Sequence, residues 1–362
     1  MKRRLRDSLT QLMLIPGLSG HEERVARAIR AALPTGTDTK TDRLGNLTAT
    51  FPGDPLAPTV LLFTHMDQLG FFVRKVEADG LIRVERMGGV SERAMAAQAV
   101  VLCTAQGDIP GIIMNKAHHA TGPDEKYTVL PTPDIRIDTG HGSKAAVEAA
   151  GIRIGTPVVY RPQVVALAGD RIAGTAIDDR AGCAVLIEVA RALSTRTGGP
   201  TVHLLWSVQE EFNLRGAVVA AQNLMPDVAI QIDLMLATDT PDMADRGEMT
   251  LGGGPGISLY SFHGRGTLNG VIPHPALVQL FEVTAQANGI PLQRSAQVGV
   301  LTDLSYVQSL GQGVASIDIG FPLRHSHSAL ECCDLGDLEG LARLTIAAIA
   351  AIGPGFEMGR DI

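Results

Sequence analysis

Hydrophobic residues recur at helical spacing shortly after Pro16 and Gly17 near the start of the chain. The residues at these three- and four-residue intervals are Val25, Ala28, Ile29, Ala32 and Leu33. This spacing predicts an amphipathic helix that packs on a sheet. Ser19 and Glu22 stand in the S-x-x-E order of a capping box, so we expect the helix to begin there. Two short apolar runs, 46–51 and 59–64, are separated by a turn rich in Pro, Gly and Asp, and they predict strands.

From residue 70 to about residue 165 the pattern changes to short alternating segments separated by Gly and Pro. The segments with strand character are 71–76, 81–85, 99–104 and 109–114. One stretch, 143–150, has helical spacing. Short alternating segments with frequent turn residues predict a small, mostly β insertion.

Beyond this insertion, segments with helical and strand spacing follow one another to the end of the chain. The helical segments are 180–193, 214–223, 275–287 and 335–352, and the strand-like runs are 201–207, 228–232, 256–262 and 314–319. Such alternation predicts a mixed α/β sheet with helices on both faces. At 362 residues the chain exceeds the size of most single cores. We therefore expect a discontinuous α/β domain, 1–69 and 166–362, interrupted by a β-rich domain, 70–165.

The composition excludes several classes of function. With 31 Lys and Arg against 38 Asp and Glu, the formal net charge is −7. We therefore expect no nucleic-acid partner, because nucleic-acid-binding proteins concentrate basic residues. No run of about 18 apolar residues occurs, so no membrane partner is expected. The basic start resembles a signal peptide, but Gln11 interrupts its apolar stretch. Four cysteines without a regular framework favour a reduced compartment, the cytoplasm.

Acidic and imidazole side chains gather where the predicted strands end. His65 and Asp67 follow the second strand, and at positions i and i+2 of an extended chain both side chains face the same way. Asp178 and Asp179 lie just before a predicted helix. Adjacent carboxylates repel each other unless cations or helix amides neutralise them. A helix N-cap is the simpler alternative for this pair.

Three further groups of the same kind occur later in the chain. Glu210 and Glu211 follow a very apolar run, Asp233 ends another, and His325 and His327 lie close to the end of the chain. Two carboxylates at the end of a buried strand are costly without a counter-charge. Since neighbouring residues on extended backbone point in different directions, one could bind a metal while the other contacts a water. Any one group is a weak indication, but all five at strand ends favour a binuclear metal site.

These groups lie in segments that resemble the M42 family of metallo-aminopeptidases, relatives of the glutamyl aminopeptidases and the tetrahedral aminopeptidases. The similar segments are PGLSGHEERV, DRLGNL, THMDQLGFFV, IDTGHGSKAAVEAAGIRIGTPVV, AIDDRAGCAVLIE, SVQEEFNLRGA, QIDLMLATDTP and FPLRHSHSALE. They run through the whole chain. The resemblance implies a zinc-peptidase-like α/β/α catalytic domain in a cytoplasmic hydrolase that removes the N-terminal residue of small peptides.

The same resemblance implies which side chains bind the metal ions. His65 and Asp233 would bind one divalent ion, Glu211 and His327 would bind the other, and Asp178 would bridge the two. His325 is an alternative to His327, but the family pattern R-x-x-H-S favours His327. Zn is the first expectation for both ions, and Co or Mn also accept nitrogen and oxygen ligands.

Two further acids take catalytic roles by resemblance. Glu210 would act as the general base on a water held between the two ions, and Asp67 would orient His65. A cis peptide bond between Asp178 and Asp179 is also implied. Gln68 stands where the family commonly has Glu, and Gly253 where a lysine is frequent, but neither departure removes a proposed metal ligand or the base.

Other functions remain open at the level of the sequence. A two-metal deacylase or amidase acting on N-acyl amino acids would use the same ions. A glycosidase would use paired carboxylates, which the two imidazoles argue against. A non-catalytic oligomeric binding protein would keep the fold without the reaction. The resemblance also implies a homo-oligomer, from a dimer formed through the inserted domain up to a tetrahedral dodecamer, with the inserted domain gating substrate access.

Overall fold

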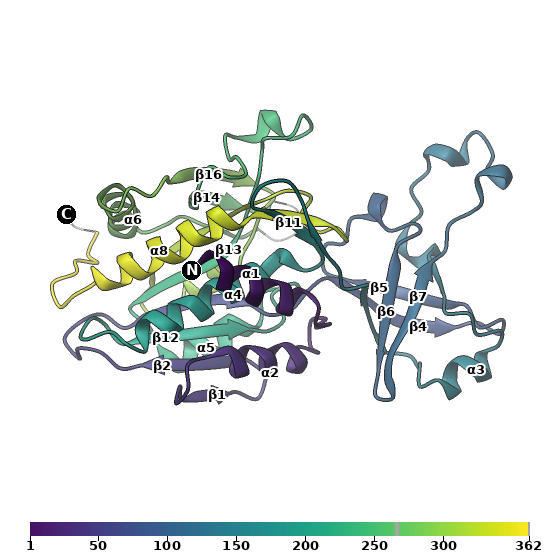
Figure 1. The fold of residues 1–362 in the computed structure, drawn as a ribbon, viewed down its shortest axis with the longest axis horizontal. Coiled ribbons are helices and arrows are strands. Elements are labelled where there is room, and N and C mark those ends of the chain that lie inside the picture. The colour runs from purple at the N-terminus through teal and green to yellow at the C-terminus, as the bar shows by residue number, and fades with distance from the viewer. Residues whose placement is uncertain (265–267, 361–362) are drawn as a thin grey trace.

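The computed structural model describes residues 1–264 and 268–360 and consists of an α/β body with a barrel at one end (Figure 1). The body contains a nine-stranded sheet in the order β1-β2-β12-β3-β13-β17-β14-β15, with β16 paired to β14. Its strands are β1 Thr39–Thr41, β2 Leu47–Phe51, β3 Val60–His65, β12 Val202–Ser207, β13 Val228–Leu236, β14 Gly256–Phe262, β15 Gly270–Val271, β16 Gln293–Val298 and β17 Ala315–Leu323. Both parallel and antiparallel pairs occur, which confirms the predicted mixed sheet.

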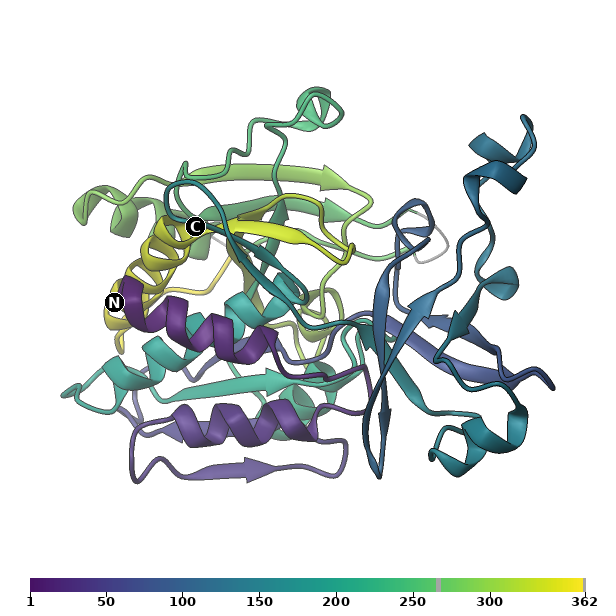
Figure 2. The ribbon, with the colours of Figure 1, turned by 45° about the vertical axis from the view of Figure 1, so that its right-hand side comes forward.

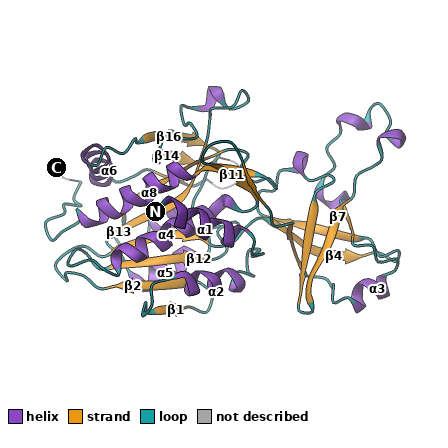
Figure 3. Cartoon of the chain, viewed as in Figure 1, coloured by secondary structure: helices purple, strands orange, loops and turns teal. Residues whose placement is uncertain are grey.

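Helices cover both faces of the sheet (Figures 2 and 3). The larger layer holds α1 Lys2–Met13, α2 Glu23–Ala32, α4 Ile177–Leu193, α6 Pro275–Ala287 and α8 Leu335–Ala350, and the smaller one holds α5 Gly216–Leu224 and α7 Leu304–Val307. Strand β3 explains why two layers are needed. Val60 and Leu62 pack into the core under the larger layer, whereas Leu61 and Phe63 pack into the core under α5 and α7. Alternate side chains of a strand face opposite sides, so a continuous apolar run must be covered twice.

Four neighbouring strands in the centre of the sheet are parallel. Strand β3 pairs in parallel with β12 on one side and with β13 on the other, and β13 pairs in parallel with β17. Their carboxyl ends therefore lie along one edge of the sheet, where α/β proteins place their sites. Because β3 leads directly into the first barrel strand, this edge lies next to the barrel (Figure 1).

The barrel is the small β-rich insertion that the sequence predicts. Six strands close in the order β4-β5-β8-β7-β6-β9 around their own apolar core. They are β4 Gly70–Val76, β5 Ile82–Met87, β6 Ala99–Thr104, β7 Gly107–Ile113, β8 Arg136–Asp138 and β9 Pro157–Tyr160. Helix α3 Lys144–Ala149 begins at Ser143, whose side chain accepts a hydrogen bond from the Ala146 amide. A separate three-stranded sheet of β10 Val164–Ala166, β11 Arg171–Gly174 and β18 Glu331–Asp334 follows the barrel.

Two predictions made from local pattern were wrong. The capping box does not form, because helix α2 begins at Glu23 without a side-chain cap and the Ser19 hydroxyl donates to Asp67 instead. Strand β13 does not end before Asp233 but continues to Leu236, because its pairing with β17 extends that far. Helix α1 was not predicted at all.

Among the residues described, no helix is both long enough and apolar enough to cross a membrane.

Candidate metal centre

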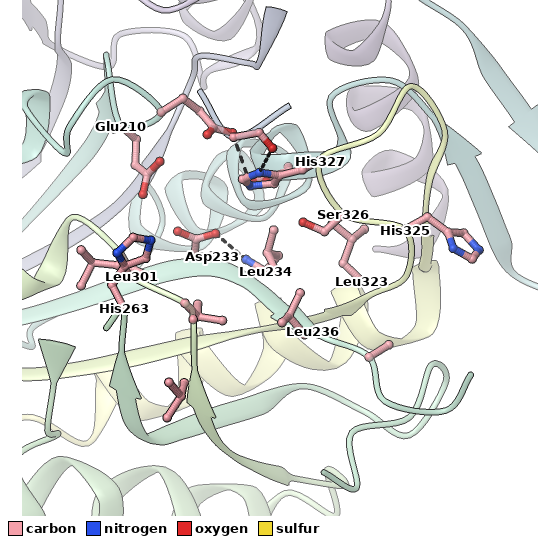
Figure 4. Close-up of a pocket in the computed structure, with 18 of the residues that line it drawn as sticks. Glu210, Asp233, Leu234, Leu236, His263, Leu301, Leu323, His325, Ser326 and His327 are labelled. Atoms are coloured by element: carbon pink, nitrogen blue, oxygen red, sulfur yellow. Dashed lines mark hydrogen bonds and ion pairs between the residues drawn. The ribbon is translucent and has the colours of Figure 1, made fainter. Parts of the chain in front are cut away.

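The structure brings five of the predicted side chains together at the carboxyl edge of the central strands. They form two groups that share one member. His65 at the end of β3, Asp178 in the first turn of α4 and Asp233 in β13 offer ligand atoms within 4.8 Å of one another, and so do Asp178, Glu211 and His327. Figure 4 shows Glu210, Asp233 and His327 around the cavity beside these groups.

Asp178 lies between the two imidazoles. Its Oδ1 is 3.1 Å from His65 Nε2, and its Oδ2 is 3.4 Å from His327 Nε2. The Asp178 backbone amide donates to Glu331 Oε2 at 3.0 Å, which fixes the residue from behind. The peptide bond to Asp179 is cis, as the resemblance implies. Each carboxylate oxygen of Asp178 is therefore directed toward a different group.

Asp67 lies behind His65 and contacts it from the side opposite Asp178. Its Oδ1 is 3.4 Å from His65 Nδ1. Burial by itself would lower the pKa of His65, but the Asp178 and Asp67 carboxylates outweigh burial and raise that pKa well above its ordinary value. A carboxylate at the far nitrogen of a ligating imidazole orients the ring and raises its basicity. The position of Asp67 suits that role.

His327 and His325 occupy different sides of the turn after β17. His327 Nδ1 donates to the Gly89 carbonyl at 3.0 Å, and since a carbonyl can only accept, Nε2 is left to face Asp178 and Glu211. A Cβ at Gly89 would lie 2.9 Å from His327 Nδ1, so this contact requires glycine. His325 is exposed and points away from the carboxylates (Figure 4). The structure thus places His327, and not His325, beside Asp178 and Glu211.

The remaining carboxylates of the site are buried and crowd one another. Burial raises the pKa of Glu211 to about 8 and that of Asp233 to about 7, and the charge of Asp178 adds to both shifts. Burial, with Asp233 and Glu211 nearby, also raises the pKa of Glu210 well above its ordinary value. Glu211 Oε1 has no hydrogen-bond partner among the described residues. Buried, mutually repelling oxygen donors next to two imidazoles fit divalent cations, which would replace the protons that these groups otherwise take up.

Metal-stripped protein is expected to lose stability as pH rises from 6 to 8. The raised pKa values of Glu211, Asp233 and the two imidazoles mean that the folded state holds more protons than the unfolded state in this window. The stabilisation that they contribute is present at low pH and is lost as pH passes through the folded-state pKa. The lowered pKa values of Asp67 and Asp178 contribute no slope here, because both groups are ionised in either state.

Thermal unfolding of chelator-treated protein at several pH values checks this expectation. Reloading with metal is expected to make the pH dependence shallower, because bound cations replace protons. Glu211→Gln should also reduce the slope of the stripped protein. A thermal midpoint of stripped protein that stays level or rises between pH 6 and 8 would contradict the electrostatic picture of the site.

A cavity of about 620 Å³ opens from the candidate metal centre. Apolar side chains, among them Leu236, Leu301 and Leu323, line it together with His263 and Arg246. It is large enough for the side chain of an amino acid and the adjoining backbone. The Cβ position of Gly253 instead faces Thr250 and Gln293, and Gly253 is not among the residues that line this cavity.

Comparison with known proteins gives this arrangement its context. The family described as M42 glutamyl aminopeptidase matches residues 45–344, most of the chain. This chain belongs to the M42 family. Membership identifies it as a hydrolase acting on peptides. It is 39% identical to SgcX of Escherichia coli (strain K12) over 360 residues, which cover 99% of this chain and 96% of that protein.

Solved structures of peptidases share the fold of this chain. Aminopeptidase APDkam598 from the archaeon Desulfurococcus kamchatkensis matches with a TM-score of 0.91 and 31% identity, covering 98% of this M42 chain and 97% of that one. The Pyrococcus horikoshii TET1 peptidase matches with a TM-score of 0.86 and 26% identity, covering 96% and 99% of the two chains. That peptidase can assemble into a tetrahedron or a large octahedral shell.

Sequence reasoning missed several residues that support this M42 site. Glu331 accepts hydrogen bonds from the backbone amides of both Asp178 and His327. Gly89 comes from the segment after β5, so the barrel side of the chain helps to orient His327. The only signal that could have found Glu331 was its place in the matched segment FPLRHSHSALE. Ser19 was noticed but was interpreted as a helix cap.

Proposed function

We propose that this protein is a co-catalytic, two-metal aminopeptidase that hydrolyses the N-terminal peptide bond of small peptides. The observation that carries the proposal is the shared position of Asp178, whose two oxygens face His65 and His327. One ion would be held by His65, Asp178 and Asp233, and the second by Asp178, Glu211 and His327. Zn is the first expectation for both, with Co or Mn as alternatives, since the donors are nitrogen and oxygen only.

Glu210 is the general base in this proposal. Its carboxyl lines the cavity beside both ligand groups but belongs to neither of them. When bound, two divalent cations would lower the pKa of a water and polarise the scissile carbonyl. Glu210 would take the proton of that water and deliver it to the leaving amine. Burial raises its pKa, which suits a group that must hold a proton between these two steps.

Asp67 serves the reaction indirectly. It contacts His65 Nδ1, and it accepts hydrogen bonds from the backbone amides of Glu210 and Glu211, each at 3.0 Å. Asp67 thus contacts the proposed ligand His65 at the end of β3. It also holds the backbone of the proposed base, Glu210, and of the proposed ligand Glu211 after β12. Such supporting contacts commonly change metal affinity or activity by about 10- to 100-fold when removed.

The inserted barrel and the assembly belong to the same proposal. We infer a cytoplasmic homo-oligomer in which residues 70–165 form the dimerisation and substrate-gating domain. The likeness to a peptidase that assembles into a tetrahedron supports the assembly. The contact between Gly89 and His327 supports a coupling between the barrel side of the chain and the site.

Metal-reloaded protein is expected to cleave aminoacyl-p-nitroanilides but not their N-acetylated counterparts. The reason is that an aminopeptidase needs the free α-amine beside the carboxylates and cations of the site. The measurement uses chelator-stripped protein, with and without added Zn, Co or Mn, on a panel of free and acetylated substrates. The panel also reveals which N-terminal side chain the cavity prefers.

Two outcomes would contradict the proposal. Cleavage of the acetylated set alone would support the two-metal deacylase or amidase. Silence on both sets, whatever the metal, would support a non-catalytic binding protein that keeps the fold.

A further inference from the structure

The turn that carries Glu210 and Glu211 is held by side chains from distant parts of the chain. Four consecutive backbone amides donate to three buried side chains. Val208 donates to Asn46 Oδ1 at 3.0 Å, Gln209 donates to Glu22 Oε1 at 3.1 Å, and Glu210 and Glu211 donate to Asp67. The strand ladder of β12 has ended at Ser207, so these amides have no strand partner in it.

The backbone of this turn departs from regular structure. Gln209, Asn213 and Leu214 all have positive φ angles, at 56°, 64° and 54°. Such angles are uncommon for residues other than glycine and persist where the surroundings impose them. Gln209 lies at the start of the turn, where the hydrogen bonds to Asn46, Glu22 and Asp67 hold the backbone on both sides of it.

Glu22 is well fixed for this purpose. It is 4% exposed, and its Oε1 accepts from Gly20 at 2.7 Å as well as from Gln209. The segment around it is docked on the end of β3, because Gly17 and Gln68 exchange backbone and side-chain hydrogen bonds. Ser19 Oγ also donates to Asp67 Oδ2 at 2.5 Å. The segment PGLSGHEERV therefore contacts the turn that carries Glu210 and Glu211, although none of its residues belongs to the two ligand groups.

Asn46 holds the same turn from its other side. Its Oδ1 accepts from Val208, and its Nδ2 donates to the Gly216 carbonyl at 2.9 Å and to Asp42 Oδ2 at 2.7 Å. One side chain thus bridges the beginning and the end of the 208–216 turn. Asn46 belongs to the segment DRLGNL, so this segment, like PGLSGHEERV, contacts the 208–216 turn.

We propose that Glu22 and Asn46 are positioning residues that aim the Glu210 carboxylate by fixing the backbone immediately before it. The inference rests on the proposed role of Glu210 as the base. Glu22 acts through Gln209, the residue preceding Glu210, and touches neither ligand group. Misplacement of a reacting group by about 1 Å can cost on the order of 100-fold in rate. We therefore expect a change at Glu22 to lower the rate of the chemical step more than it weakens metal or substrate binding.

The test compares two substitutions of nearly equal length. Glu22→Gln keeps an acceptor oxygen for the Gln209 amide, whereas Glu22→Met removes it. We expect Glu22→Met to lower kcat by about 10- to 100-fold with KM and bound metal unchanged. Glu22→Gln should restore kcat to within about 3-fold of the original protein, since one oxygen can accept both amides. Glu22→Ala also lacks the acceptor but adds no apolar bulk, so it carries the same expectation if Glu22→Met does not fold.

A matched control distinguishes positioning from general loss of stability. Asp337 is another buried carboxylate that accepts two backbone amides, those of Gly252 and Gly254, away from the cavity. Asp337→Leu is expected to lower the thermal midpoint and leave kcat unchanged. If Glu22→Met behaves like Asp337→Leu, or if it lowers bound metal or raises KM as much as it lowers kcat, the positioning role is overturned.

A second readout does not depend on catalysis. Hydrogen exchange of peptides covering residues 206–212 should be faster in Glu22→Met than in Glu22→Gln, because the Gln209 amide has lost its acceptor. Unchanged exchange would overturn the inference even if the enzyme is active. Faster exchange in a protein that cleaves no peptide would support the role of Glu22 in holding the turn and would contradict only the proposed function.

Discussion

Glu210→Gln is expected to lower kcat by about 10³-fold while both metal ions stay bound. The substitution keeps the size of the side chain and removes its ability to accept a proton. Glu210 lines the cavity, is 8% exposed, and is absent from both groups that could hold a metal. Loss of a general base typically costs about 10²- to 10⁴-fold. Of the other carboxyls that line the cavity, three belong to the ligand groups, and the fourth, Asp242, is exposed. Steady-state kinetics on the preferred aminoacyl-p-nitroanilide, with metal analysis of the same sample, measures both quantities.

The neighbouring residue provides the contrast. Glu211→Gln changes a proposed ligand, so it should lower bound metal as well as kcat. Glu282→Gln, an exposed carboxylate that pairs with Arg294 on the surface, should change neither. Loss of metal in Glu210→Gln would make Glu210 a ligand, and a fall in kcat of less than about 10-fold would place the base elsewhere.

Local pattern located the elements best where strong punctuation marks their ends. Strand β14 and helix α6 have the predicted bounds, because a Gly- and Pro-rich turn precedes the first and Pro275 stands at the start of the second. Proline is favoured at the first helical position, where its missing amide costs nothing. The pattern of apolar residues gave a wrong strand end where a buried polar residue interrupts it. Asp233 is buried inside β13, with its oxygens bonded to Gln231 and to the Leu234 amide.

The sequence predicted the groups of candidate ligands and favoured a binuclear site, but local pattern did not show which side chains share an ion. Each group follows an apolar run, and that much is visible along the chain. Their meeting depends on β12, β3, β13 and β17 lying side by side and in parallel, an order across the sheet that no local spacing contains. The resemblance to a family supplied the grouping.

The supporting contacts were beyond local reasoning for a different reason. Ser19 and Glu22 do match a capping box, and the local rule competes with a tertiary one. In the folded protein the Ser19 hydroxyl reaches Asp67, and the Glu22 carboxylate reaches Gln209, 187 residues away. The turn amides that have no strand partner donate to Glu22 and Asp67 instead, because buried amides must be paired. Ser19 and Glu22 make these tertiary hydrogen bonds, and helix α2 is left without a side-chain cap.

Asp178→Asn should be the most damaging single substitution among the proposed ligands, because both metal groups share this residue. Its Oδ1 lies 3.1 Å from His65 Nε2 and its Oδ2 lies 3.4 Å from His327 Nε2. The Asn side chain has only one oxygen that can bind a metal ion, because its NH₂ group has no lone pair available for a cation. One of the two ions must then lose a ligand outright, and the other loses the negative charge. We expect bound metal to fall below one equivalent per chain and kcat to fall by on the order of 10³-fold or more, since the cations supply several kcal/mol of charge stabilisation.

Three comparison variants make this expectation specific. Asp233→Asn and Glu211→Gln each change only one group, so each should retain close to one equivalent of metal. Asp179→Asn changes the adjacent acid, which accepts from Thr64 and from the Gly182 amide and belongs to neither group. The substitution changes these two hydrogen bonds and no proposed ligand, so metal content should stay at two. Two equivalents of metal retained in Asp178→Asn would mean that the ions do not share this carboxylate. The two groups would then be independent sites, and a co-catalytic mechanism would lose its physical basis.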